Sequence, residues 1–201
     1  MGCRNFLIKL FFSFSLLSSA QIQLDSILLP QKINETSGLE YYDDYLITHN
    51  DSGNAPKLYV TNLEGKLVLE SRIHGTINRD WEDLASDGSH YFIADIGNNK
   101  GKRKDLTIYI LNAKLILEDS IHFDYKAQTN FEKRKKHRFD AEALTVVGDS
   151  LLLFSKDRKQ FNTQLYTIPK LGGNYTLVPI AEWAVGALIT AADYDQETQL
   201  L

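Results

Sequence analysis

Asp80-Trp81-Glu82-Asp83-Leu84 decides how the rest of the chain is read, because a simpler copy, Asp140-Ala141-Glu142-Ala143-Leu144, follows sixty residues later. A third copy, Glu35-Thr36-Ser37-Gly38-Leu39, lies forty-five residues before it. Seven residues after the leucine of each copy an apolar run begins, at Leu46, Tyr91 and Leu151. Repeats at this spacing indicate a solenoid, a propeller or an array.

Each copy predicts four short β-strands. Turn residues recur every eight to twelve positions and no segment has helical periodicity, which together indicate an all-β fold. The predicted strands of the first copy are residues 35–39, 45–48, 57–62 and 67–73; those of the second are 81–85, 91–94, 107–111 and 115–125; those of the third are 141–147, 151–154, 164–168 and 176–183.

The second strand of each later copy selects among all-β architectures. Residues 91–94 and 151–154 are apolar at consecutive positions, which indicates that both faces of the strand are buried. Neighbouring blades of a β-propeller provide that environment, whereas a two-layer sandwich with one wet face does not. We therefore predict a β-propeller with four-stranded blades, and a twisted sandwich is the alternative. Trp81 is expected in the core between blades.

The predicted blades cover about residues 35–78, 80–138 and 140–185, and a fourth begins at 186–201 with an innermost strand at 189–194. Residues 24–30 resemble an outermost strand without a blade of its own. Closed propellers usually have four to eight blades, so about three and a half blades predict a truncated ring. Such a fragment is expected to be poorly soluble, because an open ring exposes strand edges.

Residues 1–20 are predicted to be a secretory signal. Arg4 and Lys9 flank an apolar segment, and Ser18-Ser19-Ala20 supplies the small residues of a cleavage site before Gln21. An uncleaved anchor is the alternative, although the apolar segment is shorter than the about 20 residues of a spanning helix. The prediction is a secreted, periplasmic or cell-surface protein whose mature chain has no membrane span.

Composition excludes several classes of function. Cys3, the single cysteine, lies within the predicted signal, so the mature chain has no disulfide, thiolate nucleophile or cysteine metal site. Removal of Arg4 and Lys9 leaves 20 basic against 26 acidic residues, a formal charge of −6. That charge argues against nucleic acid as a partner. The basic run 133–138 is expected to be a solvated loop.

The starts of the innermost strands are the first candidate site. In a propeller these starts converge at one mouth of the central channel, and they bring carboxylates together with few cations nearby. Oxygen ligands of this kind suit Ca²⁺. The alternative is that each carboxylate accepts backbone N–H groups between blades. The candidate metal ligands are Glu35, Asp80, Glu82, Asp140 and Glu142.

The loops after the second strands are the second candidate site, because equivalent loops of a repeat share one rim and loops carry most binding residues. A small molecule or a cell-surface group is the expected ligand. The candidate ligand-binding residues are His49, Asn50, Asp51, Asp95, Asn98, Asn99, Lys156 and Asp157. A turn in which Asn, Asp and Ser bond their own backbone is the alternative. The other histidines, His74, His90, His122 and His137, are expected at the surface.

These motifs, together with His49-Asn50-Asp51-Ser52-Gly53 and Asp95-Ile96-Gly97-Asn98-Asn99, resemble a group of secreted bacterial β-propeller proteins. More remotely, they are similar to the propellers of esterase-like phytases and calcium-dependent gluconolactonases. The resemblance covers about residues 33–195 and implies a secreted propeller with calcium at the channel mouth. Asn98 and Asn99 depart from it, because the group often has an acidic residue there.

Two functions remain open at this point. The first is an extracytoplasmic binding or scaffolding propeller without catalytic activity. The second is a metal-dependent hydrolase of phosphoesters or lactones, in which the channel carboxylates hold the cation. The residues alone do not decide between an enzyme and a binding module.

Overall fold

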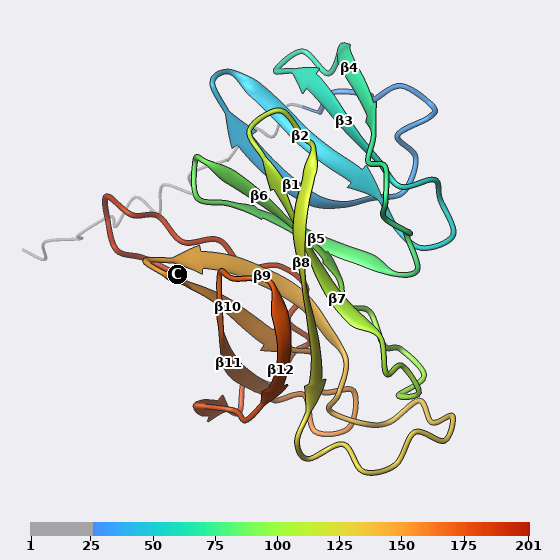
Figure 1. Ribbon diagram of the computed structural model, residues 1–201, viewed down its shortest axis with the longest axis vertical. Helices are drawn as coiled ribbons and strands as arrows, with labels where there is room; N and C mark the ends of the chain where they lie inside the picture. The colour runs from blue at the N-terminus through green and yellow to red at the C-terminus, as the bar shows by residue number, and fades with distance from the viewer. Residues whose placement is uncertain (1–25) are drawn as a thin grey trace, which may run out of the picture.

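The computed structural model describes residues 26–201, which form thirteen strands and no helix (Figure 1). The prediction of an all-β fold is therefore confirmed. Within the same residues, no helical segment has the length and apolar character that crossing a membrane requires.

The strands form three successive sheets, built mainly from antiparallel pairs of strands that are neighbours in the chain. The first sheet contains β1 (Thr36–Tyr42), β2 (Tyr45–Asn50), β3 (Lys57–Asn62) and β4 (Leu67–Arg72). The second contains β5 (Trp81–Ser86), β6 (His90–Asp95), β7 (Leu106–Asn112) and β8 (Leu117–Tyr125). The third contains β9 (Ala141–Val147), β10 (Ser150–Ser155), β11 (Thr163–Pro169) and β13 (Ala181–Trp183).

The first strands of the three sheets lie next to one another. β5 contacts both β1 and β9, and the sheets follow one another around the molecule (Figure 1). Ser37 donates a hydrogen bond from its hydroxyl to the Glu82 carbonyl at 2.6 Å, and Asp83 accepts one from the Leu144 amide at 2.7 Å. The described residues thus form consecutive blades of a β-propeller, with β1, β5 and β9 innermost.

Only glycine fits where the first two blades meet. A Cβ atom on Gly38 would lie 2.3 Å from the Leu84 amide nitrogen and 2.8 Å from Nε2 of His49. The lack of a side chain at this position therefore sets how closely β1 approaches β5.

The hydrophobic cores lie between the blades. Alternate side chains of β6 enter two different cores: Tyr91 and Ile93 pack with Trp81 against the first sheet, whereas Phe92 and Ala94 pack against the third. Because side chains alternate across a strand, this arrangement buries both faces of β6, as the consecutive apolar residues predicted. Trp81 is fully buried in the core between the first two blades, which confirms its predicted place.

The predicted outermost strand of the third blade, residues 176–183, is wrong. The segment divides into β12 (Gly173–Leu177), which pairs in parallel with β8 of the second sheet, and the short β13, which pairs with β11. Leu177 is buried in the core beside Phe123 and Tyr125. Pairing with β8 therefore satisfies both the backbone of a sheet edge and an apolar side chain.

The predicted strands at the two ends also differ from the structure. Residues 189–194 form no strand, although Ile189 and Ala192 pack against the third sheet where a next blade was expected. Residues 26–30 form no strand either, and the rest of the predicted strand at 24–30 lies outside the described residues. The predicted signal at residues 1–20 lies outside them as well.

Candidate functional site

The innermost strand of every blade contains a β-bulge at the same place. Two residues on the innermost strand face one on its neighbour, and this extra residue shifts the following side chains to the other face. Sequence periodicity does not show this shift, because it assumes strict alternation. The paired residues on either side of the bulges are Thr36 with Asn50 and Leu39 with Thr48, Trp81 with Asp95 and Asp83 with Ala94, and Ala141 with Ser155 and Ala143 with Phe154.

The same backbone hydrogen bond lies beside each bulge. The carbonyl of the residue that begins the motif accepts a hydrogen bond from the loop after the second strand. These bonds join Asp51 to Glu35 at 2.8 Å, Gly97 to Asp80 at 3.1 Å and Lys156 to Asp140 at 2.7 Å. The repeat therefore brings both candidate sites, the motif starts and the loops, to one edge of the ring.

Three carboxylates meet at this edge. One oxygen from each of Asp51, Asp80 and Glu82 lies within 4.8 Å of the others. Ca²⁺ binds oxygens at about 2.3–2.6 Å, so two ligands of one ion are separated by at most about 5 Å. We name Asp51, Asp80 and Glu82 the acidic trio. Its spacing and its oxygen donors fit a hard divalent cation.

The acidic trio fits against a glycine of the next loop. A Cβ atom on Gly97 would lie 2.1 Å from Oε1 of Glu82 and 2.4 Å from Oδ2 of Asp80. Any side chain at this position would displace both carboxylates. Gly97 is therefore part of the site, although sequence reasoning did not include it.

Glu82 has the most perturbed environment of the trio. Burial, followed by the nearby charges of Glu142, Asp80 and Asp51, raises its pKa to about 9. The Ser37 hydroxyl bonds the main-chain carbonyl of Glu82. Among residues 26–201, no group donates a hydrogen bond to the Glu82 carboxylate itself. A cation among these oxygens would supply the opposite charge that Glu82 lacks.

Two basic residues neutralise the neighbouring carboxylates of the third blade. Arg158 bonds Asp140 through Nε at 2.6 Å and Glu142 through Nη2 at 3.1 Å, and Lys156 forms an ion pair with Glu142. The expectation of few cations near the motif starts is therefore wrong for this blade. The fifth predicted metal ligand, Glu35, is exposed and accepts a hydrogen bond from Asn54.

A cavity of about 480 Å³ lies among the innermost strands, and Glu82 is the member of the trio that lines it. Its walls come from β1, β5, β9 and the segment 190–193, so the innermost strands face a shared space. Two more acids lie there: burial raises the pKa of Asp83 to about 7 and that of Glu40 to about 8. Glu82 and Glu142 line the same cavity. We name this space the axial cavity.

Several predicted ligand-binding residues are occupied by internal bonds. Asp95 accepts hydrogen bonds from the Asp80 amide at 3.0 Å and from Arg103 at 2.9 Å. Asn98 bonds Asp140 and the Phe139 carbonyl, which links the second blade to the third. These are the interblade contacts that we considered as the alternative, since a buried polar group needs a partner.

The other members of that set vary in access. His49 is fully buried with its ring edge against Trp81, and Asn50 donates to the Lys32 carbonyl. Asp157 accepts hydrogen bonds from the amides of the turn that follows it. Asp51 and Asn99 are accessible, and Asn99 lies 3.4 Å from Asp80. Contact with a ligand stays a prediction for this set.

Two further residues depart from the expectations. His137 is buried, with 4% of its surface exposed, so its predicted surface position is wrong. Its Nδ1 accepts a hydrogen bond from the Phe139 amide, and its ring lies against Gly101. Arg158 was not among the predicted site residues, although it follows the predicted residues Lys156 and Asp157 in the same loop.

Comparisons with known proteins give structural likenesses alone. No protein-family model matches the chain, and no curated protein matches it. Among solved structures, the Neurospora crassa Pan2 WD40 domain is similar with a TM-score of 0.39 and 10% sequence identity. The match covers 74% of this chain and 36% of that one, so the chain spans about a third of the matched structure.

Proposed function

We propose that this protein is an extracytoplasmic β-propeller binding module that holds a divalent cation, calcium, at the mouth of its axial cavity. The observation that carries the proposal is the approach of the Asp51, Asp80 and Glu82 oxygens to within 4.8 Å of one another. The predicted secretory signal supports an extracytoplasmic location, where calcium is abundant enough for weak sites.

The surroundings of the trio support a cation more than an unfilled acidic pocket. Burial of Glu82 in the ionised state is unfavourable unless an opposite charge lies close. Arg158 and Lys156 are already paired with Asp140 and Glu142. Because Gly97 leaves room for the Glu82 and Asp80 carboxylates, the backbone is shaped around these oxygens.

Calorimetric titration tests this function. We expect wild-type protein to bind one Ca²⁺, and Glu82→Gln to weaken binding at least tenfold because an amide provides one neutral oxygen in place of a carboxylate. Glu118→Gln, which removes an equal charge from an exposed position on β8, is the matched control and should bind as wild type does. Absence of binding by the wild type, or equal loss in both variants, would contradict the proposal.

A hydrolase of phosphoesters is the second candidate, and a specific cleft favours it over a lactonase. This cleft of about 310 Å³ opens beside the trio, with Ser52, Asp80 and Asn99 in its wall. Lys100, Lys102 and Arg103 line the same cleft. Arg103 is paired with Asp95 and Asp105. The charges of Lys100 and Lys102 would therefore hold a phosphate group next to the trio. A bound cation would supply Lewis-acid activation of the phosphoester and of water.

The two candidates differ in turnover. Incubation of the calcium-loaded protein with p-nitrophenyl phosphate, and separately with glucono-δ-lactone, measures it. Turnover that disappears in Glu82→Gln but persists in Glu118→Gln would establish the hydrolase. Calcium binding without turnover of either compound would leave the binding module.

A further inference from the structure

The basic residues gather in three loops on one side of the molecule. The loops are residues 96–105, 126–140 and 156–162, which lie near one another in Figure 1. They contain thirteen of the twenty lysines and arginines of residues 26–201, and only four of the acidic residues. This concentration contrasts with the net negative charge of the chain.

Hydrogen bonds hold these loops together. The Arg134 amide donates to the Lys100 carbonyl at 2.9 Å, and the Gln128 side chain donates to the Gly101 carbonyl at 2.9 Å. The Arg158 amide donates to the His137 carbonyl at 3.0 Å. The backbones of the three loops are therefore joined, so that binding does not have to order the loops themselves.

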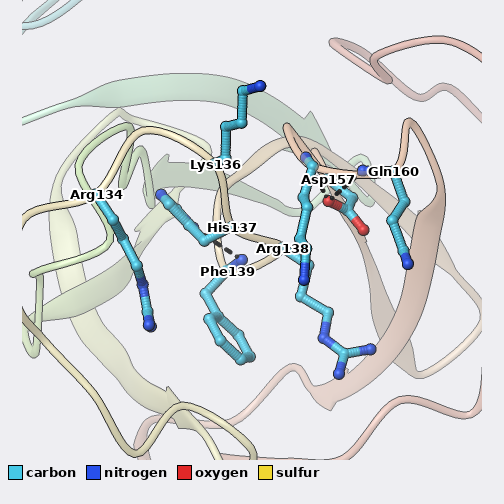
Figure 2. Close-up of a pocket in the computed structure, with 8 residues that line it drawn as sticks. Arg134, Lys136, His137, Arg138, Phe139, Asp157 and Gln160 are labelled. Atoms are coloured by element: carbon cyan, nitrogen blue, oxygen red, sulfur yellow. Dashed lines mark hydrogen bonds between the residues drawn. The ribbon is translucent and has the colours of Figure 1, made fainter.

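A cavity of about 310 Å³ opens between the second and third of these loops. Figure 2 shows Arg134 and Arg138 extending in the same direction, with the Phe139 ring between them. Lys136 and Lys159 also line it. We name these four cations and the space between them the basic pocket; it is separate from the cleft beside the acidic trio.

Within residues 26–201, carboxylates balance only a small part of the charge of the basic pocket. Asp157 is the one carboxylate that lines it, and this side chain accepts hydrogen bonds from the Lys159 and Gln160 amides of its own turn. Among residues 26–201, Arg134, Lys136 and Lys159 have no carboxylate within 4.0 Å, and Arg138 has Glu182 at 4.0 Å. Burial lowers the pKa of His137, so this residue adds no positive charge at neutral pH.

Two nitrogens beside the pocket lack partners. Nε of Arg134 and Nε2 of His137 are buried without a hydrogen bond to any residue of 26–201. The guanidinium group of Arg134 lies 5.9 Å from the centre of the Phe139 ring, which holds it in place. Nη2 of Arg134 donates a hydrogen bond to the Asn130 carbonyl at 2.7 Å, which also fixes the guanidinium group and leaves Nη1 for an oxyanion.

We propose that the basic pocket binds a small ligand that carries two or more phosphate or sulfate groups. A guanidinium group can donate two parallel hydrogen bonds to one phosphate or sulfate group. The longer, more flexible lysines can place their charges near a second anionic group. A volume of about 310 Å³ accommodates a ligand of this size. Phe139 is buried and cannot stack on bases, so a polynucleotide is not the favoured ligand.

Calorimetric titration with inorganic pyrophosphate, and separately with a disulfated disaccharide, tests the proposal and identifies the anion. EDTA in the buffer removes any contribution of the cation site. The wild type is expected to bind one equivalent of at least one probe. Lys136→Gln/Arg138→Gln should weaken binding about tenfold or more, because it removes two charge-assisted contacts.

Lys133→Gln/Lys135→Gln is the matched control, since it removes the same charge from exposed positions of the same loop that do not line the pocket. Less than about threefold weakening is expected, because charges that do not line the pocket act on the ligand only through a screened field. Glu82→Gln should bind the probe as wild type does, so the outcome is independent of the proposed calcium site. Equal weakening in both double variants would overturn the proposal, as would failure of the wild type to bind either probe.

Discussion

Glu82→Gln is expected to stabilise the calcium-free protein and to reduce its stabilisation by calcium. The pKa of Glu82 is raised from its ordinary 4.5 to about 9, so between these pH values the unfolded chain releases a proton that the folded protein retains. The contribution of Glu82 to the free energy of unfolding is therefore fully present below pH 4.5 and is lost as pH rises toward 9. Glutamine removes this dependence, and because one pKa unit corresponds to about 1.4 kcal/mol the gain at pH 8 should be up to about 5 kcal/mol.

Urea denaturation in EDTA and in excess calcium measures both effects. At a calcium concentration one hundred times the wild-type dissociation constant, the wild type should gain about 2.7 kcal/mol, and the variant, with at least tenfold weaker binding, should gain at most about 1.4 kcal/mol. Glu118→Gln, with its exposed side chain, should follow the wild type in both buffers. A destabilised Glu82→Gln protein in EDTA would show that the carboxylate is held by contacts within the chain, which argues against a cation site.

Trp81→Ala is expected to have the largest effect on folding. Trp81 is fully buried, donates a hydrogen bond from Nε1 to the Ile77 carbonyl at 3.0 Å, and packs edge-to-face with His49 at 5.5 Å. Removal of a buried tryptophan leaves a cavity and costs about 3–5 kcal/mol. Because the side chain lies between two blades, its loss weakens the contact that aligns β1 with β5.

The second tryptophan provides the control. Trp183 lies on β13 with 45% of its surface exposed, so Trp183→Ala should cost less than about 1 kcal/mol. Urea denaturation followed by far-ultraviolet circular dichroism compares the two variants without relying on tryptophan fluorescence. Equal destabilisation would mean that Trp81 does not hold the blades together.

The repeated leucines at positions 39, 84 and 144 predict the blade register correctly, because each begins a hairpin that local alternation and turn residues specify. β3 (Lys57–Asn62) and β9 (Ala141–Val147) were predicted with their observed bounds. The path of residues 173–177 was not predictable in this way. Their pairing with β8 depends on a sheet edge some fifty residues earlier, which local pattern does not encode.

The proximity of the site residues was predictable only where it follows from local sequence. Asp80 and Glu82 share a motif, so their proximity follows from local sequence. Asp51 joins them because Asn78 donates hydrogen bonds to the carbonyls of Asn50 at 2.9 Å and Asp51 at 3.0 Å, a link between blades. The pairing of Arg158 with Asp140 likewise needs the folded loop. Contacts of this kind depend on three-dimensional closure rather than on repeat position.

A crystal structure of the protein grown with calcium tests the central claim most directly. The account predicts one ion at the mouth of the axial cavity, with Asp51, Asp80 and Glu82 oxygens at about 2.3–2.6 Å from it. Calcium bound elsewhere, or an ordered acidic trio with its carboxylates turned apart and no ion between them, would contradict it.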